Sequence, residues 1–151
     1  MKTVNIYLNF EGTTEAAFNF YKSVFGGEFM GGIMRYKDFP PSEDMPPLSE
    51  AEKNLVGHVS LPLGKQILMG TDIVESLCNG HKTVMGNNVL LTLETDSIEE
   101  TETLFGKLSE GGQPLMPPAE TFWAEKFGSC TDKFGVHWQL NYTGSKAPEQ
   151  M

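Results

Sequence analysis

The sequence has few cysteines, few basic residues and few histidines. Cys78 and Cys130 are the only cysteines among 151 residues, too few for a disulfide framework and outside the CxxC spacing of many metal and redox sites. Eleven basic residues stand against twenty acidic ones, and the formal net charge is -9. Nucleic acids and anionic membranes are contacted through basic patches, so this charge argues against both as partners.

The sequence also lacks a long hydrophobic run near its start. The first ten residues, MKTVNIYLNF, alternate apolar and polar side chains, unlike the uniformly apolar core of a signal peptide or membrane helix. The sequence therefore predicts a cytoplasmic protein. Its length fits a single domain, which we place at residues 1–143, with a flexible tail at 144–151.

The first half of the chain begins with a strand and a helix. Residues 4–10, VNIYLNF, alternate in the manner of a half-buried strand. Thr13 or Thr14 can cap a helix whose apolar residues recur at steps of three and four, and two glycines after Phe25 stop it. A strand near residues 28–36 and a long surface loop at 38–54 are predicted to follow.

The second half repeats this order. Residues 87–95, NNVLLTLET, alternate like the first strand, and Ser97 with Glu100 predicts a capping box for a second helix, which ends before a double glycine. We interpret the repeat as an internal duplication of two βαβββ modules, at about 1–80 and 84–143. The fold class is therefore predicted to be α+β with eight strands.

Three segments carry a resemblance to a known family: YLNFEGTTEAAFNFYKSVFGGE (7–28), ETFWAEKFG (120–128) and TDKFGVHWQLNY (131–142). Together they resemble the PhnB-like branch of the vicinal oxygen chelate superfamily, which includes glyoxalase I, extradiol dioxygenases and bleomycin-binding resistance proteins. The resemblance implies that the paired modules form an eight-stranded open cup. It also implies a homodimer, because members commonly pair two chains.

In the metal enzymes of that superfamily, His and Glu ligands come from the first and last strands of each module. The matching positions here are Asn5, Asn88 and Gln139, and the fourth falls near Leu68 or Met69. Amide oxygens are weak ligands beside imidazole or carboxylate. The sequence therefore predicts no divalent metal and no other cofactor.

Strand alternation divides the side chains of the predicted strands into two faces. The face expected to pack on the helices holds Val4, Ile6, Leu8, Val89, Leu91, Leu93, Val136, Trp138 and Leu140. The face expected to line the cup holds Asn5, Tyr7, Asn9, Asn88, Thr92, His137, Gln139 and Asn141, with Trp123 near it. A lining of neutral hydrogen-bonding groups suits an uncharged or weakly polar small molecule.

Three residues are candidates for proton transfer: His58, His137 and Glu120. Imidazole and carboxylate groups serve as general acids and bases. Each also has a structural alternative, since strand histidines are often only hydrogen-bonded and Glu120 can bond backbone at a turn. Tyr7 and Trp123 can likewise be packing elements.

These observations leave three functions open. The first is binding of a small organic molecule in a polar cup without metal. The second is a lyase, isomerase or dioxygenase relative that uses a non-standard metal site or metal-free acid and base chemistry. The third is an accessory protein whose cup is filled by side chains. Related sequences are labelled ubiquinone-pathway methyltransferases, but FGGEFMGGIM (25–34) lacks the strand, GxGxxG and helix order of a methyl-donor loop.

Overall fold

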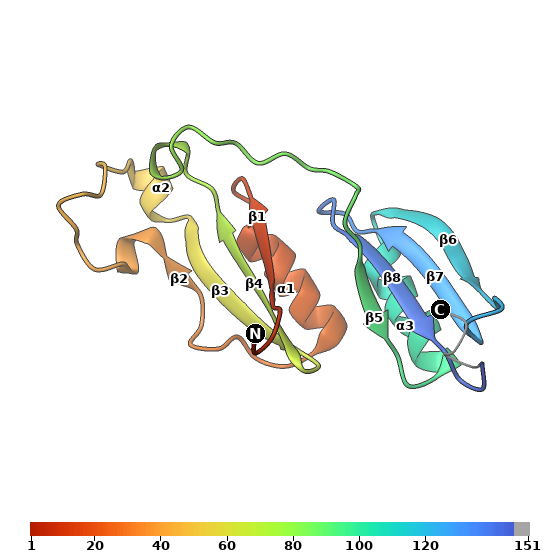
Figure 1. The fold of residues 1–151 in the computed structure, drawn as a ribbon. Helices are drawn as coiled ribbons and strands as arrows, with labels where there is room; N and C mark the ends of the chain where they lie inside the picture. Colours follow the sequence, from red (N-terminus) through yellow and green to blue (C-terminus); the bar gives the residue numbers. More distant parts are fainter. Residues whose placement is uncertain (147–151) are drawn as a thin grey trace. The chain divides into compact units, whose positions relative to one another are not determined.

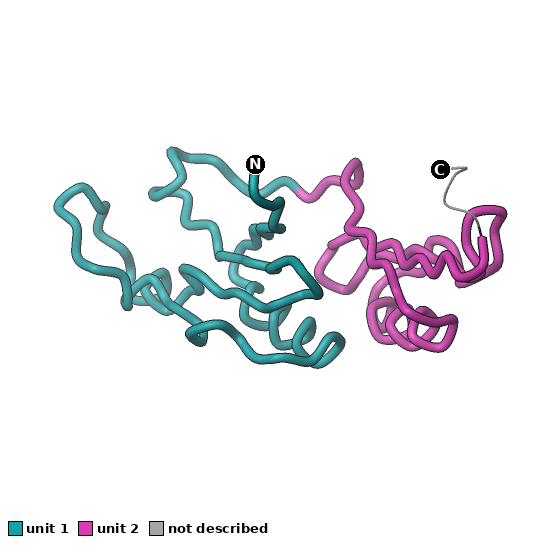
Figure 2. Tube along the Cα trace, turned by 60° about the horizontal axis from the view of Figure 1, so that its bottom comes forward, with its two compact units in different colours: residues 1–84 teal, residues 85–151 magenta. Residues whose placement is uncertain are grey.

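The chain forms two compact units, residues 1–84 and residues 85 onward, in a computed structural model that describes residues 1–146. Each unit contains a four-stranded mixed sheet and one long helix (Figure 1). The strand orders are β1-β4-β3-β2 and β5-β8-β7-β6, so the two units share one topology (Figure 2 colours them separately). The α+β class and the duplication are confirmed, while the joining of the sheets into one cup stays a prediction.

The first unit follows the βαβββ order. β1 pairs in parallel with β4, and β4 pairs antiparallel with β3. The elements are β1 (Ile6–Phe10), α1 (Thr14–Phe25), β2 (Met34–Arg35), η1 (Tyr36–Asp38), α2 (Glu50–Lys53), β3 (Val56–Leu63), β4 (Gln66–Asp72) and η2 (Glu75–Leu77).

The core of the first unit lies between α1 and one face of its sheet. Phe18 and Tyr21 on α1 are fully buried, as are Leu61 on β3 and Leu68 on β4. The helix approaches β4 closely at Gly70, where an added Cβ would lie 2.5 Å from the ring of Phe18. Glycine is therefore required there by packing rather than by backbone conformation.

The second unit repeats the arrangement. Its elements are β5 (Leu91–Glu94), α3 (Ile98–Ser109), β6 (Gln113–Ala119), β7 (Lys126–Thr131) and β8 (His137–Tyr142). Trp138 and Leu140 on β8 are fully buried. The predicted start of α3 is confirmed, and Ser97 Oγ accepts the backbone N–H of Glu100, which is one of the two hydrogen bonds of the predicted capping box.

Two residues assigned to the apolar face are instead exposed. Val4 is 68 % exposed and Val89 is 67 % exposed, because each precedes its strand. The predicted strand at 87–95 begins only at Leu91. Asparagines are poor strand formers, and the two at the start of this segment follow a glycine.

Two other boundaries were also wrong. The strand predicted at 28–36 is reduced to β2, because Gly31 and Gly32 have φ values of +74° and +75°, in the left-handed region that a strand does not use. The loop predicted at 38–54 contains helix α2, which Ser49 and Glu52 begin with a capping box.

The predicted flexible tail at 144–151 falls mostly on residues 147–151, which lie outside the described part of the chain. Before them, the backbone N–H and hydroxyl of Ser145 donate to the carboxylate of Glu125. Within residues 1–146, every helix is too short or too polar to cross a membrane.

Candidate functional site

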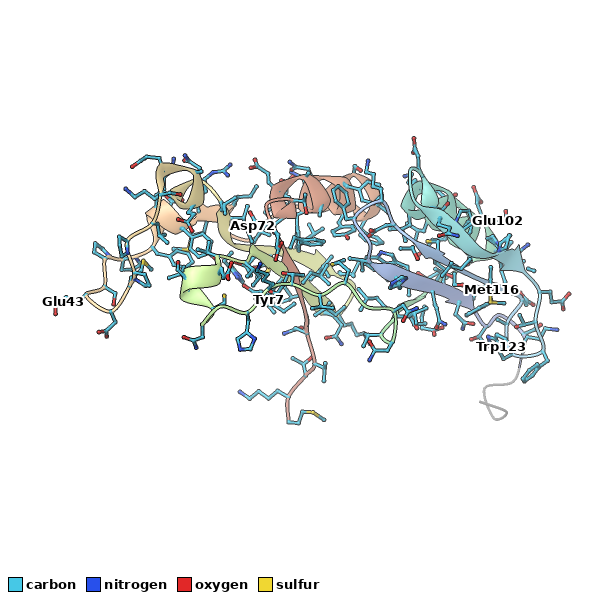
Figure 3. All side chains as sticks on the ribbon, turned by 90° about the horizontal axis from the view of Figure 1, so that it is seen from above. Tyr7, Glu43, Asp72, Glu102, Met116 and Trp123 are labelled. Atoms are coloured by element: carbon cyan, nitrogen blue, oxygen red, sulfur yellow. The ribbon has the colours of Figure 1, made fainter. Side chains whose placement is uncertain are left out.

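The face of the first sheet that points away from α1 carries hydrogen-bonding side chains from three strands. Tyr7 comes from β1, His58 and Ser60 from β3, and Thr71 from β4. We call this the first polar face. Figure 3 shows Tyr7 and Asp72 on opposite sides of the sheet, and Asp72 lies on the side of α1, where it bonds Thr14.

A chain of three side chains crosses the first polar face. Tyr7 Oη lies 3.1 Å from His58 Nδ1, and His58 Nε2 lies 3.0 Å from Ser60 Oγ. Both partners of the imidazole are hydroxyl groups, which donate or accept equally well. His58 can therefore hold its proton on either ring nitrogen, and a proton can pass along the chain without loss of a hydrogen bond.

A second phenol, that of Tyr36, lies near this chain. The Tyr36 hydroxyl donates to the backbone oxygen of Asp72, at 2.6 Å, and lies 3.2 Å from Thr71 Oγ1. Partial burial raises the pKa of Tyr7 above its usual value, and the hydroxyl of Thr71 partly opposes this shift. The pKa of Tyr36 is raised for the same reason. Both phenols therefore stay protonated at neutral pH and remain hydrogen-bond donors.

The second sheet has a corresponding polar face, which we call the second polar face. Thr92 Oγ1 on β5 donates to Gln139 Oε1 on β8, at 3.0 Å. Two residues further along each strand, Asn141 Nδ2 donates to Glu94 Oε2 at 2.9 Å. Neighbouring strands therefore present polar pairs side by side.

Asn141 has one unsatisfied group. Its side chain is buried, with 3 % of its surface exposed, and its Oδ1 has no hydrogen-bond partner among the described residues. The amide orientation is determined by Glu94, because a carboxylate accepts and the Nδ2 group must therefore face it. The unpaired atom is an acceptor that lacks a donor.

Aromatic side chains pack near this face. Trp123 contacts Phe122 and Phe127 edge to face, with ring centroids 4.9 Å and 5.2 Å apart. Phe127 shares the polar side of β7 with Asn141, its partner in the ladder. Trp123 is therefore held beside the second polar face by packing, and its predicted ligand contact stays a prediction.

The other predicted acid and base candidates have structural partners. His137 Nε2 donates to the backbone oxygen of Gly86 at 2.9 Å, and Nδ1 then accepts from Thr131 Oγ1 at 2.7 Å. Glu120 forms an ion pair with Lys146, at 2.6 Å. Of the three candidates, His58 alone has partners that leave its tautomer free.

The positions matching the superfamily's metal ligands do not suit a metal. Asn5 Oδ1 accepts the backbone N–H of Ile67, Gln139 Oε1 accepts from Thr92, and Asn88 precedes β5. Each engaged amide oxygen already accepts one hydrogen bond, and as a neutral donor it would be a weak metal ligand. Within residues 1–146, no three His, Cys, Asp or Glu side chains gather as a metal would require.

Strand register separates the two candidates for the fourth position, which the sequence left between Leu68 and Met69. Met69 pairs with Tyr7 and lies on the polar face, whereas Leu68 is fully buried on the other side. A thioether is a poor ligand for hard divalent cations. The donor set therefore does not fit the metal of the catalytic members.

Sequence reasoning missed several residues of these faces. Ser60 stands two positions after His58, and Glu94 two positions after Thr92, so continued alternation would have found both. Tyr36 had no such signal because it lies in the 3-10 helix η1. Asn9 is exposed on β1, with the parity expected for the polar face.

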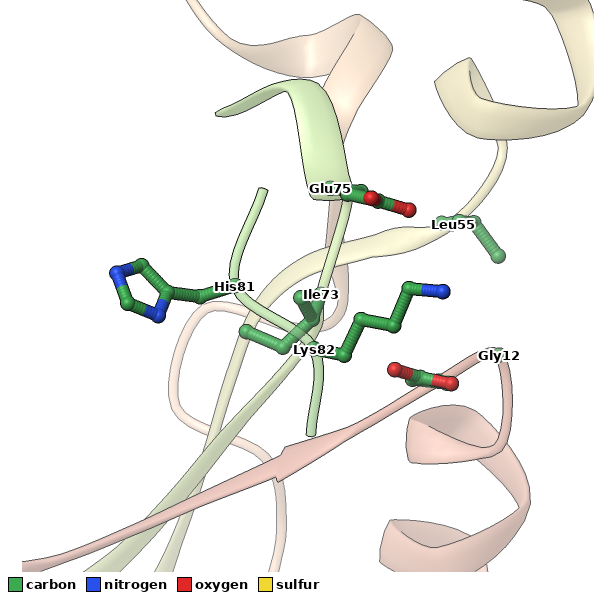
Figure 4. A pocket seen from close by; sticks show the side chains of 7 residues that line it. Gly12, Leu55, Ile73, Glu75, His81 and Lys82 are labelled. Carbon is green, nitrogen blue, oxygen red and sulfur yellow. The ribbon is translucent and has the colours of Figure 1, made fainter. Parts of the chain in front are cut away.

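A hollow in the first unit was not predicted at all. It has a volume of about 380 Å³ and lies where β1 and β4 end, lined in part by Glu11, Glu75 and Lys82. Figure 4 shows Glu75 and Lys82 extending toward this space, while the imidazole of His81 points away from them. These residues follow strands or belong to connections, where periodicity carries no signal.

Comparison with known proteins places the chain in a family. Residues 2–141 match the model of a family described as 3-demethylubiquinone-9 3-methyltransferase. Protein YjdN of Escherichia coli K12 is 30% identical over 140 residues, covering 89% of this chain and 91% of YjdN.

Solved structures agree with this placement. Protein PA1353 from Pseudomonas aeruginosa is 32% identical with a TM-score of 0.76, over 93% of this chain and 98% of its own. A PhnB protein from Bacillus cereus is 31% identical with a TM-score of 0.70, over 93% and 99%. A glyoxalase/bleomycin resistance protein/dioxygenase family enzyme from Burkholderia phytofirmans, 18% identical over 93% and 96%, shares the fold with a TM-score of 0.61. The chain therefore belongs to the PhnB-like family described as 3-demethylubiquinone-9 3-methyltransferase, and it has the glyoxalase-like fold.

Proposed function

We propose that this protein binds a small organic molecule on its polar faces without a divalent metal. The observation that carries the proposal is the buried, unpaired Oδ1 of Asn141. A buried acceptor without a donor costs roughly 1–3 kcal/mol. A ligand N–H or O–H group that reaches this atom would offset that cost, and the Thr92 and Gln139 pair beside it offers further polar contacts.

The family description names a methyltransferase, but the chain offers little support for that reaction. The glycines of residues 26–32 follow helix α1 rather than connecting a strand to the start of a helix. Such a strand, loop and helix is the arrangement that cradles dinucleotides and similar cofactors. We therefore place ligand binding ahead of methyl transfer.

The metal-free part of this proposal is tested by metal addition. Chelator-stripped protein would receive Mn, Fe(II), Co, Ni or Zn singly under reducing conditions, with metal content and melting temperature measured. We expect no stoichiometric binding and no rise in melting temperature, because the matching positions carry amides. One metal that binds at one equivalent and stabilises the protein would contradict this expectation.

The binding part is tested with a library of small neutral polar compounds, followed by 1H–15N NMR. Compounds that bind should shift the side-chain amide signals of Asn141 and Gln139. The Gln139→Leu substitution should weaken the binding of these compounds. Gln113→Leu is the matched control, because Gln113 is exposed on β6. Binders that perturb other surfaces only, or a library without binders, would remove the support for this function.

A second candidate is metal-free proton transfer, which the chain of Tyr7, His58 and Ser60 favours. In such a step Tyr7 Oη takes a proton from a carbon next to a carbonyl, while its own proton passes to His58 Nδ1. The imidazolium then returns the proton through Tyr7 to the oxygen of the resulting enolate, so that the ketone is isomerised to its enol without an oxidant or reductant.

Phenylpyruvate in D2O provides a probe for this candidate. Protein-dependent exchange of its C3 protons, lost in Tyr7→Phe and His58→Gln and kept in His137→Gln, would support the candidate. Exchange no faster than in buffer would eliminate it. Equal loss in all three variants would instead indicate a general structural effect.

A further inference from the structure

The hollow in the first unit lies at one end of the sheet, where β1 and β4 finish and β3 begins. β1 and β4 are parallel, so the residues that follow them, including Glu11 and Ile73, meet at that end of the sheet. β3 runs antiparallel to β4, and Leu55, which precedes β3, therefore reaches it too. These residues line the hollow together with Glu75 and Lys82, and none belongs to either polar face.

The buried carboxylate of Asp72 binds together the chain segments that surround the hollow. Asp72 Oδ1 accepts the backbone N–H of Gly12 at 3.0 Å, and Oδ2 accepts that of Val56 at 2.9 Å. The segment that follows η2 is attached to the end of β1 by a separate hydrogen bond, since the backbone N–H of Thr83 donates to Glu11 Oε1 at 3.0 Å. The segments around the hollow are therefore positioned before any ligand arrives.

The charged groups of the hollow are not neutralised by one another. Neither the Lys82 ammonium nor the Glu75 carboxylate has an ion pair or a hydrogen bond to another side chain within residues 1–146. The ion pairs of the described chain involve other lysines and an arginine. Leu55 and Ile73 add aliphatic surface beside these charges.

We propose that this hollow binds a small aliphatic zwitterion of the amino-acid type. Its ammonium would pair with the carboxylates of Glu75 and Glu11, its carboxylate with Lys82, and its hydrocarbon part with the two aliphatic side chains. The volume of about 380 Å³ lies within the usual range of about 300–1,000 Å³ for small-molecule sites. A ligand with one charge leaves the opposite charge of the hollow unmatched.

Three compounds with one hydrocarbon skeleton test this proposal. L-Leucine carries both charges, 4-methylpentanoate lacks the ammonium, and 3-methylbutylamine lacks the carboxylate. In 1H–15N NMR titrations to about 10 mM, we expect saturable shifts of the Gly12, Ile73 and Lys82 amides with leucine. Each analogue should bind at least about tenfold more weakly, since one charged contact is lost.

Two variants and one control complete the test. Glu75→Gln and Lys82→Met should each weaken leucine binding by about tenfold or more. Lys65→Met, at the exposed turn between β3 and β4, should leave it unchanged. Absence of saturable shifts, equal binding of the analogues, or an equal effect of Lys65→Met would each overturn the proposal.

This site and the polar faces can fail independently. Gln139→Leu should not alter leucine binding in the hollow. If leucine instead shifts the amides of Thr92, Gln139 and Asn141, the hollow is not its site and the proposal is overturned, while ligand binding on the second polar face is supported.

Discussion

At the scale of single residues, His58 and His137 differ in the kind of partner that each imidazole has. His58 lies between two hydroxyl groups, whereas His137 donates to a backbone carbonyl, which can only accept. The carbonyl locks the tautomer of His137, and the hydroxyls leave that of His58 free. Both histidines lie on strands and would look alike from sequence.

The raised pKa values of Tyr7 and Tyr36 lead to a prediction about alkaline pH. Because burial favours the neutral phenol, both should ionise above the usual value of about 10. The contribution of these two phenols to the free energy of unfolding is fully present below about pH 10, and it is lost as pH rises through their folded-state pKa. Ultraviolet titration of the folded protein should show tyrosines that ionise above the usual pH, and the Tyr7→Phe substitution should remove one of these ionisations.

The same titration in urea provides the control, since all tyrosines should then ionise near the ordinary value. A Tyr7→Phe difference spectrum that titrates near pH 10 in the folded protein would contradict the prediction.

Asp72 leads to a second prediction at this scale. Its carboxylate accepts four hydrogen bonds, three of them from backbone N–H groups. Asp72→Asn removes the charge and can turn an NH2 group toward one of these donors, so the free energy of unfolding should fall by about 2–3 kcal/mol. Urea denaturation would measure this. Asp44→Asn, in an exposed loop, should change stability by less than about 0.5 kcal/mol.

At the scale of elements, each long helix approaches a glycine on its sheet. Gly70 on β4 faces Phe18 of α1, and Gly128 on β7 lies under Phe105 of α3, where an added Cβ would be 3.2 Å from the ring. Glycine in a strand usually weakens it, so its presence indicates close approach of a neighbour. Because neither glycine has a side chain, the rings of Phe18 and Phe105 have room to pack against the two sheets.

We therefore predict opposite effects for two glycine-to-alanine changes. Gly70→Ala should lower the free energy of unfolding by about 1–3 kcal/mol, because Phe18 is fully buried and cannot move away. Gly106→Ala, on α3 with open space around its Cβ position, should raise it by up to about 1 kcal/mol through helix propensity. Chemical denaturation measures both.

A double-mutant cycle checks the cause. In a Phe18→Leu background the cost of Gly70→Ala should be smaller, because the smaller side chain relieves the contact. An unchanged cost would show that the backbone of β4, rather than the ring, is responsible.

At the scale of the whole molecule, each four-stranded sheet ends in two edge strands, β1 and β2 in one unit and β5 and β6 in the other. Unpaired edges invite association, and natural proteins commonly cover them. We predict a homodimer, as the family resemblance also implies. Sedimentation over a dilution series at about micromolar concentration should show a dimer that dissociates only at the lowest concentrations, and a monomer throughout would refute it.

The sequence by itself determined the family, the duplication, both long helices and the alternating faces of β1 and β8. These features depend on local signals: periods of 2 and 3.6 residues, caps and double glycines. Strand ends at Val4 and Val89 were wrong because alternation continued beyond the residues that actually pair. The polar candidates on strands were placed with correct parity where their strands formed.

Only the tertiary structure decided which of those side chains meet. Tyr7 and His58 are 51 residues apart in sequence, and the choice of Met69 over Leu68 depended on the register of β1 against β4. The unpaired oxygen of Asn141 and the hollow beside Lys82 also arise from segments that are distant along the chain. Pairing and register are long-range properties, since a shift of one residue exchanges the two faces of a strand, and no local pattern records them.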